Sequence, residues 1–186
     1  MKRFSISIAI VIGVLILTRP VHAAHLTTSP LHAGDAFPEF SGQTLTGRSF
    51  TLPAAATDKS AVLVFSFSRK AGKDARLWNE HLAMDFPHAV HAYGIILLES
   101  APKVFWGLAI SGIKSSMPVS VQDRTLVMFR DEEVWKQRLA VTDVSRAYVL
   151  LLGPAGNIRW MNSSAFSDAM YARLKNHLQE LTHPHP

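Results

Sequence analysis

The chain has 186 residues and a formal net charge of +5 at pH 7, and it contains no cysteine. The absence of cysteine excludes disulfides, thiolate nucleophiles, zinc–thiolate sites and iron–sulfur clusters. Residues 1–23 carry three of the 19 Lys and Arg residues, so their removal leaves 16 bases against 14 acids and a net charge of +2. This balance gives no bulk attraction to nucleic acid or to an anionic membrane, and any basic character must be local.

The first 23 residues have the regions of a cleavable signal peptide. Lys2 and Arg3 give a positive start, and an apolar run of ten residues extends over 8–17. Val21 and Ala23 put small residues at the positions that signal peptidase reads, which predicts cleavage after Ala23. A membrane-spanning helix needs about 20 apolar residues, so an uncleaved anchor is the less favoured alternative. We expect a periplasmic or secreted protein without a transmembrane segment after cleavage.

The remainder divides into a leader, one domain and a tail. Residues 24–33 are polar and show no pattern, and residues 182–186 read Thr-His-Pro-His-Pro, so we expect both ends to be flexible. Residues 34–181 contain no linker. A chain of this length buries about 70% of its unfolded surface in one core and needs no disulfides.

Turn residues and apolar periodicity predict alternating strands and helices within residues 34–181. The expected strands are a hairpin within 37–52 that turns at Gly47, then 61–67, 92–98, 124–129, 147–152 and 157–160. The expected helices are one that ends at Phe86 with a stripe of Ala75, Trp78 and Leu82, then 102–112, 132–139, and a last one with Phe166, Met170, Leu174, Leu178 and Leu181 on one face. This alternation predicts an α/β sheet with helices on both faces.

This order of elements resembles the thioredoxin-like superfamily, especially its redoxin and thiol-specific antioxidant branch. The resemblance covers roughly residues 34–181. It implies a thioredoxin-like fold with a central mixed β-sheet, helices on both faces and an N-terminal β-hairpin extension. Members of the superfamily place Cys-x-x-Cys at the start of the helix after the first central strand. In this sequence that slot reads Ala71, Gly72, Lys73 and Asp74.

A second hallmark of the superfamily is also missing. The position equivalent to the cis-proline falls at Ala147 or its neighbours, and the sequence there contains no proline. Because a thiolate is the nucleophile of the superfamily's chemistry, we expect no catalytic residue in this chain. It is expected not to be an enzyme, and above all not a thiol-disulfide oxidoreductase or a peroxidase.

A narrower resemblance is to the cysteine-poor family of the mitochondrial ATP-synthase assembly factor. Residues 65–69, Phe-Ser-Phe-Ser-Arg, followed by Trp78 are similar to that family's strand, arginine and helix tryptophan. Residues 148–160, from Tyr148 through Gly-Pro-Ala-Gly to Trp160, are similar to its hairpin. The resemblance implies an assembly-factor or chaperone-like module that acts on a membrane subunit rather than on thiols.

Basic residues gather where the first central strand meets its helix, at Arg69, Lys70, Lys73 and Arg76. Loops at such junctions form the usual ligand crevice of open α/β sheets, and a helix N-terminus attracts anions. Arg159 is a further candidate, because strand alternation exposes it if Trp160 packs inward. These residues could bind an anion or an acidic peptide. The alternative is a solvated helix face with a Lys70–Asp74 pair.

The favoured hypothesis is a protein partner in the cell envelope, bound at the former active-site edge, with no cofactor. One alternative is an enzyme or carrier that binds an anionic small molecule around Arg69 and Lys73. A metal or haem carrier is the other alternative. The usefully placed histidines are His81, His88, His91 and His177. Their spacing supplies too few ligands for a metal site of fixed geometry, so no metal is expected.

Overall fold

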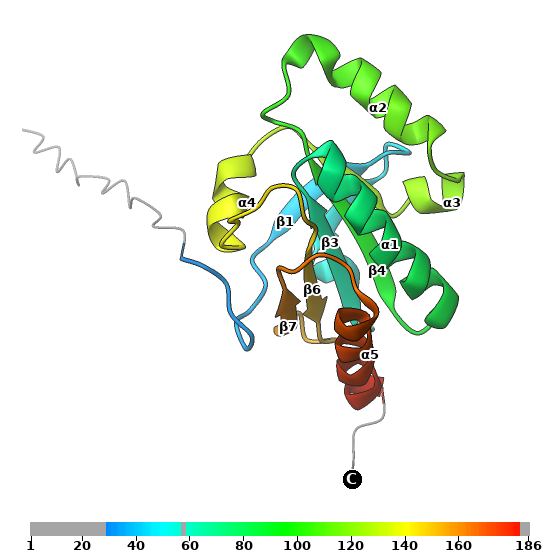
Figure 1. Ribbon diagram of the computed structural model, residues 1–186, viewed down its shortest axis with the longest axis vertical. Coiled ribbons are helices and arrows are strands. Elements are labelled where there is room, and N and C mark those ends of the chain that lie inside the picture. The colour runs from blue at the N-terminus through cyan, green and yellow to red at the C-terminus, as the bar shows by residue number, and fades with distance from the viewer. Residues whose placement is uncertain (1–28, 57–58, 183–186) are drawn as a thin grey trace, which may run out of the picture.

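The computed structural model describes residues 29–56 and 59–182. The predicted signal peptide lies outside these residues, and so does nearly all of the predicted tail. Seven strands form one mixed sheet in the order β2-β1-β5-β4-β3-β6-β7 (Figure 1). The strands are β1 (Phe40–Thr44), β2 (Ser49–Leu52), β3 (Ala61–Ser66), β4 (His91–Leu97), β5 (Thr125–Met128), β6 (Tyr148–Leu152) and β7 (Ile158–Asn162).

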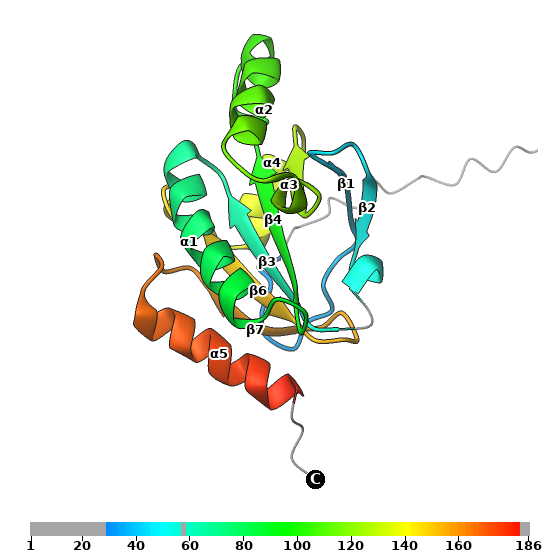
Figure 2. The same ribbon diagram turned by 90° about the vertical axis from the view of Figure 1, so that its right-hand side faces the viewer.

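Helices cover both faces of the sheet. They are η1 (Ala54–Ala56), α1 (Arg69–Asp85), η2 (Lys103–Phe105), α2 (Trp106–Ser115), α3 (Val119–Gln122), α4 (Glu132–Arg138) and α5 (Asp168–Thr182). One face packs against α1 and α5, which lie on the same side of the sheet in Figure 2. The other face is closed by α4, η1 and the segment around Phe37. The predicted mixed sheet with helices on both faces is confirmed.

The centre of the sheet is built by β3, whose six residues are all buried. It pairs in parallel with β4 and antiparallel with β6. Its side chains alternate between the two apolar cores, with Leu63 and Phe65 on one face and Val62 and Val64 on the other. The hairpin β1–β2 turns at Gly47, whose φ of 89° suits glycine, and extends the sheet beyond β5. The parallel strands β3, β4 and β5 all end at the edge where α1, η2 and α4 follow.

Two helices differ from the expectation. The helix expected over 102–112 begins as η2, and α2 then continues past Gly112 to Ser115. Glycine lowers helix propensity by about 1 kcal/mol but does not forbid a helix, and this explains the wrong end point. In the last helix Phe166 precedes the first turn, and Tyr171 is a buried residue that the expected stripe lacks. No helix of the described residues is long and apolar enough to cross a membrane.

Part of the predicted leader contacts the domain. Leu31 donates its backbone N–H to the carbonyl of Arg138 at 2.8 Å and packs partly buried against the core. Gly34 and Asp35 exchange backbone hydrogen bonds with Ile158 at the edge of β7. Residues 31–35 are therefore fixed to the domain by backbone hydrogen bonds to α4 and β7.

Candidate functional site

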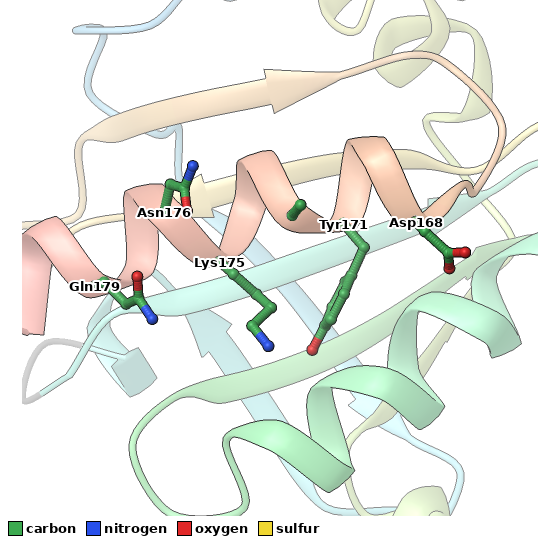
Figure 3. Close-up of a pocket in the computed structure, with 6 residues that line it drawn as sticks. Asp168, Tyr171, Lys175, Asn176 and Gln179 are labelled. Carbon is green, nitrogen blue, oxygen red and sulfur yellow. The ribbon is translucent and has the colours of Figure 1, made fainter.

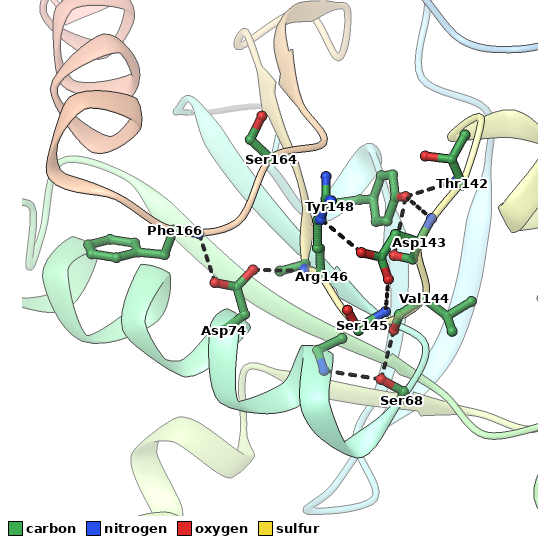
Figure 4. Close-up of polar contacts among 12 residues, drawn as sticks. Ser68, Asp74, Thr142, Asp143, Val144, Ser145, Arg146, Tyr148, Ser164 and Phe166 are labelled. Carbon is green, nitrogen blue, oxygen red and sulfur yellow. Dashed lines mark hydrogen bonds and ion pairs between the residues drawn. The ribbon is translucent and has the colours of Figure 1, made fainter.

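The candidate site is the corner where β3 passes into α1 (Figure 4). Ser68 is the N-cap, with extended backbone angles, and its side chain accepts a hydrogen bond from the backbone N–H of Ala71 at 3.1 Å. The same hydroxyl donates to the carbonyl of Val144 at 2.7 Å. Ser68 therefore caps α1 and ties its first turn to the loop that leads into β6.

Asp74 holds three segments of the chain together at this corner. One carboxylate oxygen accepts the backbone N–H of Ala147 at 2.9 Å, and the other accepts that of Phe166 at 2.7 Å. Figure 4 shows the Asp74 carboxylate with one dashed contact toward Phe166 and a second toward the segment that leads into β6. Both bonds are charge-assisted and so are stronger than bonds between neutral groups. We call this arrangement the carboxylate clasp; it joins α1, the start of β6 and the loop before α5.

The four residues expected in the superfamily's redox slot include no nucleophile. Ala71 presents only a methyl group, which is fully buried under the first turn of α1. Gly72 and Lys73 are exposed, and Asp74 uses both carboxylate oxygens in the clasp. Ala147, at the position expected for the cis-proline, donates through a backbone N–H that a proline lacks. The two residues that replace the expected cysteine and the expected cis-proline, Asp74 and Ala147, are thus joined by one hydrogen bond.

The loop over residues 142–146 is rigidified by its own polar contacts. The hydroxyl of Tyr148 accepts the backbone N–H groups of Thr142 and Asp143 at 3.0 and 3.2 Å. Asp143 accepts from Ser145 and pairs with Arg146 at 2.9 Å. Hydrogen bonds from Ser145, aided by Arg146 and by Lys70, hold the pKa of Asp143 below its usual range.

The four basic residues of the corner are brought together on the exposed side of α1. We call Arg69, Lys70, Lys73 and Arg76 the basic row; all are exposed. Arg76 pairs with Glu80 at 2.9 Å. Within residues 29–56 and 59–182, the structure shows no ion pair for Arg69, Lys70 or Lys73. The expected Lys70–Asp74 pair does not form, because the backbone of Ala147 and Phe166 takes up the carboxylate.

Arg159 does not join the basic row. It is exposed on β7, next to Ile158, which pairs with Leu152. Leu152 also pairs with Ala61 at the start of β3, whereas the basic row follows the end of that strand. Arg159 and the basic row thus lie at opposite ends of the sheet. The alternation of side chains along β7 correctly predicted that Arg159 is exposed. It does not predict at which end of the sheet Arg159 lies.

Three of the four candidate histidines pack against aromatic rings. The ring of His81 lies 4.6 Å from that of Phe166, and its Nδ1 is 2.9 Å from the carbonyl of Leu77. His91 stacks on Tyr93, and His177 lies beside Trp160 and Glu180. His88 is exposed, and its carbonyl accepts from Lys59. In the part of the chain that the structure describes, no three His, Cys, Asp or Glu residues gather as metal ligands would.

A shallow hollow of about 270 Å³ runs along α5 (Figure 3). Tyr171 and Lys175 point from it toward α1, where both donate to Asp85, at 3.1 and 2.8 Å. Burial, with help from Asp85, raises the pKa of Tyr171, and the bond from Lys175 lowers that of Asp85. Because these polar groups bond one another and fasten α5 to α1, the hollow is structural.

A second hollow, of about 360 Å³, lies between residues 30–33 and the β6–β7 surface. Its walls include Leu150 and Met161. Neither hollow is lined by a residue of the basic row. The four residues of the basic row are exposed, so the corner presents a charged surface to solvent.

The sequence reasoning missed three polar groups near this edge. Ser68 directly precedes the helix, a position where serine is a strong N-cap signal. Glu99 accepts the backbone N–H of Glu132 at 2.8 Å, and Glu132 accepts that of Ser100 at 2.9 Å. This reciprocal bracket fixes the loop after β4 to the start of α4. Glu132 is buried and pairs with Lys136 at 2.8 Å.

Comparison with known proteins agrees with the family resemblance that the sequence suggested. The model of a family described as ATP10 protein matches residues 32–181. No curated protein matches the sequence at a significant level.

Three solved structures that are described as redox proteins share the predicted thioredoxin-like fold. A Chlorobium tepidum protein described as thiol:disulfide interchange protein DsbE superposes with a TM-score of 0.60 at 14% identity, over 82% of this chain and 99% of that one. The thioredoxin domain of a Bacteroides vulgatus thiol-disulfide oxidoreductase gives 0.56 at 18%, over 80% and 99%. A thiol peroxidase from Chromobacterium violaceum gives 0.55 at 14%, over 83% and 90%. At such identities the likeness shows the fold alone.

Proposed function

The chain belongs to the ATP10 protein family, and on that premise we propose that it is an exported assembly factor that binds a protein partner through its basic row. The observation that carries the proposal is the state of the redox slot. Ala71 is buried and inert, and Asp74 is consumed by the carboxylate clasp. What the corner leaves exposed is cationic, and this surface can bind but cannot attack.

The chemistry of the basic row favours an acidic polypeptide segment. A guanidinium such as that of Arg69 bonds a carboxylate through two parallel N–H groups. Lys70 and Lys73 add point charges on the same first turns of α1. Ser68 and the carboxylate clasp hold this helix end in place, so little freedom is lost when a partner binds.

The redox likeness of the fold does not extend to the reaction. Thiol-disulfide exchange needs a thiolate, and the sequence contains no cysteine. A role in assembly requires only a surface that a partner recognises. The family suggests ATP synthase as the first complex to examine.

A gene deletion with complementation tests this function. In a strain without the gene, assembled ATP synthase is quantified on native gels after complementation with wild type, with Arg69→Ala plus Lys73→Ala, or with Arg159→Ala. Arg159 is the matched control, because it is an exposed arginine at the opposite end of the sheet. We expect the wild type and Arg159→Ala to restore assembly and the double variant to fail.

Two outcomes would contradict the proposal separately. Normal ATP synthase in the deletion strain would rule out that complex as the client. Full complementation by the double variant would rule out the basic row as the contact. Thermal melts of both variants keep the comparison valid, since exposed substitutions change the free energy of unfolding by no more than about 0.5 kcal/mol.

A further inference from the structure

The helix α2 differs from α1, α4 and α5 because none of its residues is buried. Large apolar side chains are nevertheless concentrated around it. Of the eight large hydrophobic residues that are exposed in the described chain, five lie between positions 104 and 121. These are Val104, Phe105, Leu108, Val119 and Val121. Val104 is 81% exposed and Leu108 is 73% exposed, so the domain's own packing does not explain them.

The helix is nevertheless held firmly at both ends. Trp106 stacks on Phe129 with ring centroids 4.2 Å apart, and its indole N–H donates to the carbonyl of Ala101 at 2.8 Å. At the other end Gln122 donates to the carbonyls of Lys114 and Met117, both at 3.0 Å. Between these anchors α2 projects beyond the edge of the sheet as a ridge (Figures 1 and 2).

The charge pattern of this segment has one sign. Between Glu99 and Asp123 the sequence contains no acidic residue, and its only charges are Lys103 and Lys114. The outward row of α2 is exposed and uncharged, and it consists of Leu108, Ser111, Gly112 and Ser115. A helix that faces water ordinarily carries charged residues on its outer side. This helix instead has a cation near each end and an uncharged face between them.

We propose that the ridge formed by η2 and α2 lies on the surface of an anionic lipid bilayer. Val104, Phe105 and Leu108 would enter the boundary between headgroups and acyl chains. Lys103 and Lys114, about 16 Å apart along a helix, would reach the phosphates on either side. A short helix with apolar side chains and flanking lysines has the pattern of an interfacial helix, and α2 is too short to span a membrane.

A bilayer suits this surface better than an apolar groove in another protein. The ridge is convex and projects from the body, so a plane can contact its whole length without a preformed cavity. The complementary charge is negative, which anionic headgroups supply continuously along the ridge. Because the domain as a whole is nearly neutral, the attraction at this ridge must come from its local cations, Lys103 and Lys114. The inference does not depend on the partner of the basic row.

The absence of cysteine allows a direct test by single-site labelling. A solvent-sensitive fluorophore is attached to the full chain at Leu108→Cys or, as a matched control, at Met84→Cys. Met84 is 68% exposed at the far end of α1. Phosphatidylcholine vesicles are added with and without about one third phosphatidylglycerol. The label reports contact at its own position, so any binding by residues 1–28 does not affect the comparison.

We expect the label at position 108 to shift to shorter wavelength and brighten several-fold on phosphatidylglycerol vesicles, while the label at position 84 stays unchanged. Adding Lys103→Glu and Lys114→Glu should remove most of the response, and so should high salt. A label at 108 that ignores the anionic vesicles, or responds no more than the label at 84, overturns the inference and leaves the ridge for an apolar protein partner.

Discussion

The helices α1 and α2 follow neighbouring parallel strands at the same edge of the sheet, yet they differ in what they bury. The buried side of α1 carries four residues, Ala71, Ala75, Trp78 and Leu82, and its charges face water. In contrast, α2 buries none and turns Leu108 outward. Every apolar position of the α1 stripe is thus explained inside the domain. The composition of α2 is not, so α2 is where a contact outside the domain is to be sought.

The largest expected difference comes from truncating one apolar side chain on each helix. Trp78 is fully buried against Phe166 and Tyr171, so Trp78→Ala should lower the free energy of unfolding by about 3–5 kcal/mol. Leu108→Ala should change it by no more than about 0.5 kcal/mol. Urea denaturation of both variants measures the contrast. Losses of similar size would mean that α2 belongs to the core.

The carboxylate clasp should give the next largest effect. Asp74→Ala leaves the amides of Ala147 and Phe166 without their acceptor, which should cost about 2–4 kcal/mol. Asp74→Asn retains one acceptor oxygen and should lose less. Lys73→Ala, at the exposed neighbouring position, is the control and should lose no more than about 0.5 kcal/mol. If Asp74→Ala and Lys73→Ala melt alike, the clasp has no structural value.

A smaller change in the free energy of unfolding should depend on pH through Glu132, which bonds the backbone of Ser100 just before η2. Burial acts to raise the pKa of Glu132, but bonds from Lys136 and Ser100 outweigh it and hold that pKa below the ordinary value of 4.5. A depressed pKa in the folded state means that the stabilisation is complete above the unfolded pKa and is lost as the pH falls through the folded one. The advantage of the wild type over Glu132→Gln should therefore be full at about pH 7 and shrink below about pH 4.5.

Glu133 provides the control for that titration. It also lies 2.8 Å from Lys136 but is 77% exposed, so Glu133→Gln should leave the free energy of unfolding close to that of the wild type. Unfolding free energies of the three proteins across the acid range decide the matter. An advantage over Glu132→Gln that grows on acidification would contradict the assigned pKa direction.

The smallest effect is a gain. A β-carbon at Gly112 in α2 would meet no atom within 4 Å, so Gly112→Ala should stabilise the domain by about 0.5–1 kcal/mol. Gly156→Ala should do the opposite, because its φ is +76° and a β-carbon would lie 2.9 Å from Pro53. Thermal melts compare the two. A loss at Gly112 would show that α2 packs closely inside the domain.

Local patterns predicted most of the fold. The buried run of β3, the Gly47 turn and the stripe of Ala75, Trp78 and Leu82 are all confirmed, because each depends on neighbours within a few residues. The family resemblance drawn from residues 65–69 and 148–160 is confirmed as well. The domain limits and the export signal remain predictions.

The candidate site was less predictable because its contacts are distant in sequence. Asp74 accepts hydrogen bonds from Ala147 and Phe166, which follow it by 73 and 92 positions in the sequence. No spacing rule connects residues so far apart. Arg159 was grouped with the basic row for its exposure, although the order of strands places it at the other end of the sheet. Pattern indicates the face on which a side chain lies. Only the topology gives its position on that face.

Hydrogen exchange at single amides tests the structural role of Asp74 most directly. Asp74 lies at the position expected for a thiol in redox-active members of the superfamily. In the wild type the amides of Ala147 and Phe166 should exchange slowly. In Asp74→Ala both amides should exchange far faster under native conditions. The amides of β3 should remain among the slowly exchanging ones in this variant. The control variant Lys73→Ala should exchange as the wild type does. Unchanged protection of Ala147 and Phe166 in Asp74→Ala would contradict the clasp.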